Sequence, residues 1–263
     1  MTNLKPPLKW AGGKRWLVPT LKPLWEHHKH RRLVEPFVGG MAVSLGLNPA
    51  QALLNDINLQ LINFYRWLWK GLEITIPMEN DQDLYYAHRD RFNHLIAEGT
   101  GSAEGNAEAA QLFYYLNRTG FNGLCRFNKQ GGYNVPFGKY KSISYNTADL
   151  NNYRYVSSFW EFSCCDFEWL DISKNDFIYA DPPYDTEFTQ YSSTPFLWDE
   201  QVRLASWLAA RSVPVVASNQ ATDRILDLYE GLGFAITIVD APRRISCNGD
   251  RTPAKEMLAT LNL

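Results

Sequence analysis

The residues with the clearest chemical meaning are Asp181, Pro182, Pro183 and Tyr184, which directly follow the hydrophobic run 177–180. The amino group of a base or an amide is a poor nucleophile because its lone pair is delocalised. Asp181 could accept a hydrogen bond from one N–H of the amino group, and the Pro182 carbonyl could accept one from the other N–H. Tyr184 offers a flat surface for stacking. The pattern indicates activation of a planar amine; the structural alternative is an ordinary Pro-Pro turn after a strand.

The run 177–180 predicts a buried strand that stops abruptly, because neither proline can donate to a sheet ladder. Asp181 would then lie at the carboxyl end of that strand, where open α/β sheets bind their ligands.

Two more segments fit the nucleotide-binding half of a Rossmann-like unit. Residues 33–40 predict a strand and a glycine turn, followed by a helix over 41–47. A second predicted strand, 52–54, leads to Asp56 at a spacing suited to ribose hydroxyls, although a cap for a helix over 58–69 is the structural alternative. The turn does not match G-x-G-x-x-G, so the pattern favours an adenosine-type ligand without a pyrophosphate.

A further glycine turn with two lysines, 8–14, is a weaker candidate for a ligand cradle. The other expected elements are helices over 16–25, 84–97, 147–158, 198–209 and 221–229, strands over 162–164, 213–217, 234–239 and 254–261, and a linker-like stretch over 98–102.

Residues 109–148 contain no Asp or Glu, while cations and aromatic residues alternate through glycine turns. The cations are Arg118, Arg126, Lys129, Lys139 and Lys141, and the aromatic residues are Phe121, Phe127, Tyr133, Phe137 and Tyr140. Such a surface suits a nucleic-acid duplex, because cations bind phosphates and a flat side chain can fill a gap in the base stack. A solvated loop with some aromatic core is the alternative. The polar stretch 185–195 has the composition of a lid, and the basic stretch 243–251 suits phosphate contact.

The composition is that of a globular protein: 263 residues, 45% hydrophobic and 21% charged. A net charge of -2 means that DNA binding must come from a local patch. The four cysteines show no metal-type spacing, and we expect no metal site. No hydrophobic run approaches the ~20 residues of a membrane span, and the N-terminus lacks a signal-peptide core. We therefore expect a cytoplasmic protein, without membrane contact, acting as a monomer.

The motifs occur in an order that resembles the Dam-type DNA adenine-N6 methyltransferases (D12 class, alpha group). They are LKWAGGK at 8–14, EPFVGG at 35–40, Asn55-Asp56, YLNRTGFNGLCR at 115–126, NVPFG at 134–138, DPPY at 181–184, Ser218-Asn219 and RRIS at 243–246. The resemblance implies a Rossmann-like catalytic domain, 1–57 and 146–263, with an inserted helical and β-hairpin target-recognition domain, 58–145. It also implies S-adenosylmethionine as methyl donor, S-adenosylhomocysteine as product, and a flipped adenine in duplex GATC as substrate.

The resemblance implies roles for individual residues. Those implied for the donor site are Trp10, Lys14, Glu35, Phe37, Gly39, Asp56 and Asp181. Those implied for DNA are Lys9 and Tyr140 at the outer guanine, Arg126 as a guanine fork, Leu124 and Pro136 at the thymine, Phe121 as a wedge beside Asn122, and Arg118, Asn128 and Arg243 as further contacts.

Two positions depart from the family pattern. Met41 stands where a second glycine is frequent, and Phe121 stands where a tyrosine is familiar, which keeps stacking but removes the hydroxyl. The alternatives are a longer or different site containing GATC, an RNA substrate, a non-catalytic DNA-binding module, and a protein-glutamine methyltransferase. The last class usually has Asn in place of Asp181 and has no use for the acid-free segment.

Overall fold

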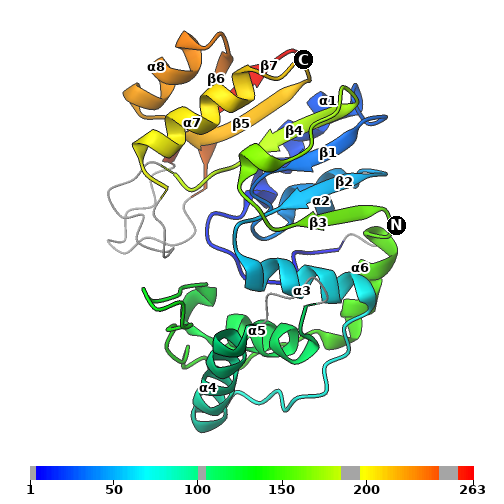
Figure 1. Cartoon of the computed structure of the whole chain (residues 1–263), viewed down its shortest axis with the longest axis vertical. Coiled ribbons are helices and arrows are strands. Elements are labelled where there is room, and N and C mark those ends of the chain that lie inside the picture. Colours follow the sequence, from blue (N-terminus) through cyan, green and yellow to red (C-terminus); the bar gives the residue numbers. More distant parts are fainter. Residues whose placement is uncertain (1–3, 100–104, 185–195, 243–253) are drawn as a thin grey trace.

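The computed structural model describes residues 4–99, 105–184, 196–242 and 254–263. Its centre is a seven-stranded sheet with the strand order β3-β2-β1-β4-β5-β7-β6 (Figure 1). The strands are β1 Arg32–Glu35, β2 Ala52–Asn55, β3 Trp160–Ser163, β4 Asp176–Ala180, β5 Val215–Gln220, β6 Ala235–Ala241 and β7 Ala254–Leu261. The pairs are parallel except for those of β7, which runs antiparallel to β5 and β6. The predicted α/β class is confirmed as a mixed, mostly parallel sheet.

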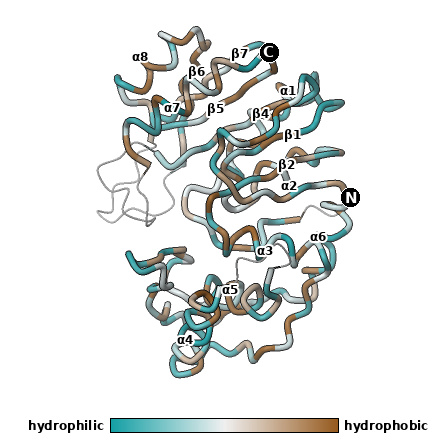
Figure 2. The backbone as a smooth tube through the Cα atoms, in the orientation of Figure 1, coloured by the Kyte–Doolittle hydropathy of each residue, from teal (hydrophilic) through white to brown (hydrophobic). Residues whose placement is uncertain are grey.

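Helices pack on both faces of this sheet and also form a layer beyond one of them (Figure 1). They are α1 Val18–Glu26, α2 Ala42–Leu47, α3 Leu59–Lys70, α4 Gln82–Glu98, α5 Ala107–Thr119, α6 Leu150–Val156, α7 Trp198–Ala209 and α8 Asp223–Gly231. Successive strand residues point to opposite faces. Leu33 and Phe177 accordingly pack with α1 and α3, while Val34 and Ile178 pack with α7 and α8. Along helices such as α4, hydrophobic and hydrophilic residues alternate, as expected for helices with one buried face (Figure 2).

The strand order reverses between β1 and β4, because the chain goes from β1 to β2 and β3 on one side and continues with β4 and β5 on the other. A crevice forms outside the carboxyl ends of parallel strands at such a reversal. The segments that leave β1 and β4 carry Phe37 and Asp181, respectively. The topology therefore brings the glycine turn and the Asp-Pro-Pro-Tyr motif to one place.

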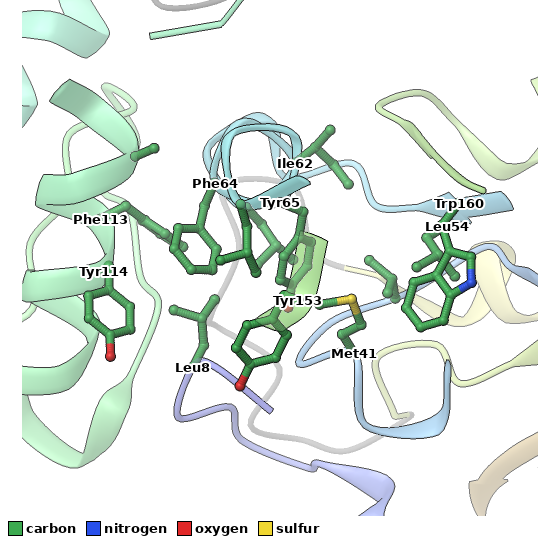
Figure 3. Close-up of a cluster of buried hydrophobic side chains, with 14 of the residues drawn as sticks. Leu8, Met41, Leu54, Ile62, Phe64, Tyr65, Phe113, Tyr114, Tyr153 and Trp160 are labelled. Carbon is green, nitrogen blue, oxygen red and sulfur yellow. The ribbon is translucent and has the colours of Figure 1, made fainter. Parts of the chain in front are cut away.

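One hydrophobic cluster continues from the sheet to the helices beyond it (Figure 3). It includes Leu54 on β2, Trp160 on β3, Tyr65 on α3 and Phe113 on α5. Helix α3 contacts both β3 and α5, and α4 packs on α5. In Figure 1, α4 and α5 accordingly lie on the far side of α3 from the sheet. The helical part and the sheet share a continuous core.

The expectation of a surface over all of 109–148 is wrong for its first part. Residues 109–119 form most of α5, and nearly all of them are buried. The signal was present, because Ala109, Leu112, Phe113 and Leu116 follow the i, i+3, i+4, i+7 spacing of a helix with a buried face. The absence of acids there reflects burial rather than contact with an anionic partner.

The remaining elements agree with the sequence within a few residues, with two informative shifts. The strand predicted over 213–217 runs from Val215 to Gln220, because its last residues pair with β7. Ser218 and Asn219 therefore lie inside a strand rather than after it. The strand predicted over 162–164 is β3, which begins at Trp160.

No helix among the described residues combines the length and the hydrophobicity that crossing a bilayer requires.

Candidate active site

A cavity of about 390 Å³ lies at the carboxyl ends of β1, β2 and β4. The residues predicted for the donor site and for catalysis all line it: Trp10, Lys14, Glu35, Phe37, Gly39, Asp56, Asp181, Pro182, Pro183 and Tyr184. Further lining residues that the sequence did not single out include Ile57, Asn58, Cys125, Tyr179 and Phe196. The structure thus brings residues from distant parts of the chain around one space.

The turn after β1 requires glycine for space. A Cβ atom at Gly39 would lie 2.7 Å from Nε1 of Trp10, and one at Gly40 would lie 2.8 Å from Cβ of Trp10. The indole therefore packs directly on the backbone of the turn. Met41, which replaces a frequent glycine, has a φ of 60° and adopts the left-handed conformation all the same. Met41 therefore holds a backbone conformation that glycine adopts more readily than other residues.

Asp56 is held by this turn. Its carboxylate accepts hydrogen bonds from the backbone N–H groups of Gly39 at 3.1 Å and of Asn58 at 3.0 Å. The prediction of Asp56 as a possible cap of α3 is corrected here, because Asn58 is the cap and accepts from the backbone of Gln60 and Leu61. Burial raises the pKa of Asp56 to about 6, although the two N–H donors oppose the rise. Asp56 therefore links the two strand ends and presents a carboxyl group to the cavity.

Glu35, the last residue of β1, is buried with an incomplete set of partners. Its side chain is 2% exposed, and Oε1 has no hydrogen-bond partner among the described residues. Burial raises the pKa of Glu35 to about 8, hydrogen bonding from Ser44 opposes the rise, and the nearby Asp181 adds to it. An unpaired buried oxygen costs free energy, so this lining position suits a ligand that brings an N–H or O–H donor.

Asp181 is held by two donors on one oxygen. Lys14 Nζ lies 3.1 Å from Oδ1, and the hydroxyl of Ser218 donates to the same atom at 2.8 Å. Ser218 in turn lies 2.9 Å from the hydroxyl of Tyr179 on the neighbouring strand. No contact among the described residues uses Oδ2, which leaves that oxygen as an acceptor at the cavity.

The rest of the motif is held by residues of β7 and α7. Tyr184 donates its hydroxyl to Oε2 of Glu256 at 2.6 Å, and the Pro183 carbonyl accepts an N–H of Gln201 at 2.8 Å. Lys14 Nζ also lies 4.5 Å from the centre of the Tyr184 ring. Sequence reasoning missed Glu256 and Gln201. The available signal for Glu256 was an acid within the hydrophobic run of a predicted closing strand.

The predicted DNA-binding residues gather mainly in a hairpin after α5. Two bridges define it, Gly120 with Phe137 and Phe127 with Tyr133. Arg126 donates from Nε to Oδ1 of Asn134 at 2.8 Å and from Nη2 to the Asn134 carbonyl at 3.2 Å. The guanidinium is therefore oriented before any partner binds.

The wedge position lies next to this hairpin. Phe121 is 46% exposed, and its neighbour Asn122 adopts a φ of 52°. Pro136 is exposed and its carbonyl accepts the Phe121 N–H at 2.9 Å. An exposed ring held by the backbone is suited to insertion into a stack.

The other predicted contacts have structural partners. Lys9 Nζ donates to the Arg118 carbonyl and lies 4.0 Å from the Tyr140 ring centre. Arg118 donates to the Ser144 carbonyl, and Asn128 accepts the N–H bonds of Gln130 and Gly132 within its own turn.

Tyr133, expected among the duplex-facing aromatic residues, is 2% exposed and belongs to the core. Leu124, expected at the thymine, lines the cavity. Arg243 and the stretches 185–195 and 243–251 lie outside the described residues.

Comparison with known proteins gives the cavity a context. A family model described as D12 class N6 adenine-specific DNA methyltransferase matches residues 10–245. The chain is similar to the DNA adenine methylases of Escherichia coli K12, at 34% identity over 96% of this chain and 93% of the relative, and of Vibrio cholerae, at 34% over 96% and 94%. It is also similar to the DNA N-6-adenine-methyltransferase of Escherichia phage P1, at 35% identity, of which it spans 35% of the length.

Proposed function

The chain belongs to the D12 class N6 adenine-specific DNA methyltransferases, and we propose that it transfers a methyl group from S-adenosylmethionine to an adenine flipped out of duplex GATC. The observation that carries this proposal is the position of Asp181. Its carboxylate is fixed by Lys14 and Ser218, its Oδ2 is open, and it lines the same cavity as the glycine turn.

The residues of the cavity fit S-adenosylmethionine. Asp56 at the end of β2 suits the ribose hydroxyls, and the unpaired Oε1 of Glu35 suits the amino group of the donor. Trp10 and Phe37 supply apolar walls beside the Gly39 turn. The donor supplies a methyl group on a positively charged sulfur, which needs no further activation as a leaving group.

The amine clamp is made by the protein itself. Asp181 Oδ2 and the Pro182 carbonyl would accept hydrogen bonds from the two N–H groups of the adenine amino group, which directs its lone pair at the methyl carbon. The N–C bond would form as the S–CH3 bond breaks, S-adenosylhomocysteine would leave, and the extra proton on the nitrogen would pass to Asp181 or to solvent. Tyr184 stacks against the base and fixes its plane. Orientation of this kind contributes up to roughly 7–11 kcal/mol in well-held systems.

We assign residues 58–145 to target recognition and the rest of the chain to catalysis. The hairpin after α5 supports this division, because it presents Arg126 as a preoriented fork and Phe121 as an exposed wedge. Lys9 and Tyr140 complete the reading surface at the outer guanine. Arg118, Asn128, Leu124, Pro136 and Arg243 remain assigned to the DNA side of the site.

A protein-glutamine methyltransferase is disfavoured by the family match and by Asp181 itself. A longer site containing GATC remains the main alternative. The test uses labelled S-adenosylmethionine with matched duplexes that carry GATC, GTTC or GATC within varied flanks. Transfer to every GATC duplex and none to GTTC supports the proposal; transfer restricted to one flank identifies a longer site, and transfer to GTTC alone overturns GATC recognition.

A further inference from the structure

Glu256 on β7 is a buried carboxylate in contact with the catalytic motif. Glu256 is 8% exposed, and its chain neighbours Met257 and Leu258 belong to the hydrophobic core. Its Oε2 accepts the Tyr184 hydroxyl at 2.6 Å and lies 3.9 Å from Lys14 Nζ. A buried carboxylate costs desolvation energy that a hydrophobic residue would not. Packing alone therefore does not explain its presence.

The contact has a defined direction. Burial, Asp181 and Glu256 all raise the pKa of Tyr184, so its hydroxyl keeps its proton and donates to Oε2. Burial also raises the pKa of Glu256, while Lys14 and the Tyr184 hydroxyl oppose that rise. The hydrogen bond anchors the end of the ring that lies farthest from the backbone.

The anchored ring is connected to the carboxylate of the motif. Lys14 Nζ lies 3.1 Å from Asp181 Oδ1, and the same atom lies 4.5 Å from the Tyr184 ring centre. The cation thus sits among the two carboxylates and the ring. A shift of the Tyr184 ring would displace Lys14 and, through Lys14, the carboxylate of Asp181.

We propose that Glu256 is a positioning residue for methyl transfer, which fixes the plane of the Tyr184 ring through its hydroxyl before the base enters. This proposal rests on the proposed function of the same site. Glu256 acts through Tyr184 and touches neither the base nor the donor. Its removal should slow the chemical step, because a loosely held stacking surface raises the cost of orienting the amine.

The test compares Glu256→Met, which keeps the length but removes the acceptor, with Glu256→Gln, which keeps an acceptor oxygen. We expect Glu256→Met to lower the single-turnover rate on a GATC duplex by about tenfold, the scale of one hydrogen bond to a charged acceptor. Duplex affinity should change by less than about twofold, since ground-state binding is not affected. Glu256→Gln should stay within about threefold of the unmodified protein.

A double variant that also carries Tyr184→Phe shows whether Glu256 affects the rate through the Tyr184 hydroxyl. In Tyr184→Phe, which lacks the hydroxyl, Glu256→Met should reduce the rate by only about threefold or less, because the shared hydrogen bond is already gone. Equal losses in both backgrounds, an unchanged rate in Glu256→Met, or an equally large loss in Glu256→Gln would overturn the proposal. The matched control is Asp240→Asn, an exposed carboxylate on β6 that pairs with Lys255.

Thermal unfolding of each variant separates rate effects from folding. If Glu256→Met does not fold, Tyr184→Phe alone carries the test, because it removes the same hydrogen bond: a rate loss with unchanged duplex affinity supports the proposal, and an unchanged rate overturns it. Absence of transfer by the unmodified protein on every duplex would instead reject the proposed function.

Discussion

Nζ of Lys14, from the first glycine turn, lies 3.1 Å from Oδ1 of Asp181, at the end of β4. The two side chains are 5% and 20% exposed. This ion pair joins the N-terminal segment to the central strand and fixes the carboxylate on which the proposed chemistry depends. A buried cation next to a carboxylate is also a stability element, because each charge would be costly without the other.

Replacement of Lys14 by Met should destabilise the protein by about 3 kcal/mol, because it leaves Asp181 without its counter-charge. Addition of Asp181→Asn should recover part of this loss, since the unpaired charge is then removed. Urea unfolding of both variants at neutral pH checks the pair. A double variant less stable than Lys14→Met would contradict a stabilising ion pair.

Glu35 should make the stability of the protein depend on pH. Its pKa is raised to about 8 in the folded state from 4.5, so the folded protein keeps a proton that the unfolded chain releases. Stability should therefore fall as pH rises from 4.5 to about 8, by up to about 1.4 kcal/mol per pH unit, and no further above that. In Glu35→Gln the part of this fall that Glu35 causes should disappear, while the part from Asp56, whose pKa is also raised, should remain.

Chemical unfolding of both proteins across this pH range measures the effect. The difference in unfolding free energy between Glu35→Gln and the unmodified protein should grow with pH and then level off. A constant difference from pH 4.5 upward would show that Glu35 does not titrate as its burial indicates.

Phe121→Ala should impair methylation of a fully paired GATC duplex by about tenfold or more, on the scale of one lost base-aromatic stack. The loss should shrink when the target adenine faces an abasic position, because extrusion of an unpaired base costs less. Single-turnover rates on the two duplexes provide the comparison. Tyr155→Ala on α6, which is 78% exposed, is the matched control. Equal losses on both duplexes would refute a wedge role.

Arg126→Ala should relax specificity at one guanine by about 1–3 kcal/mol, the value of a bidentate contact. Lys129→Ala, on the exposed tip of the same hairpin, should instead weaken binding of all duplexes alike and reduce its salt dependence. Rates across a library of single-base variants of GATC distinguish the two. Unchanged selectivity in Arg126→Ala would show that Arg126 makes no bidentate contact with a guanine.

Much of the cavity lining could be predicted because its signals are local. The strand before Asp181 is a short hydrophobic run closed by prolines, and the turn at Gly39 follows a similar run. Parallel strands place such ends at one edge of a sheet. The joint lining of one cavity by Gly39, Asp56 and Asp181, which follow β1, β2 and β4, agrees with this rule.

Other features depend on contacts that no local pattern encodes. The extension of β5 to Gln220 results from pairing with β7. The partnership of Tyr184 with Glu256 depends on the same antiparallel strand, which returns from far along the chain. Tertiary pairing, not propensity, decides these features.

The most direct test of the central claim compares Asp181→Ala with the unmodified protein on one GATC duplex, with labelled S-adenosylmethionine. We expect rapid single-turnover transfer by the unmodified protein and loss of at least about 10³-fold in the variant, because the amine loses its charged acceptor and its orientation. Duplex affinity, measured by fluorescence anisotropy, should remain within about threefold. Transfer by Asp181→Ala at the rate of the unmodified protein would show that Asp181 does not activate the amine.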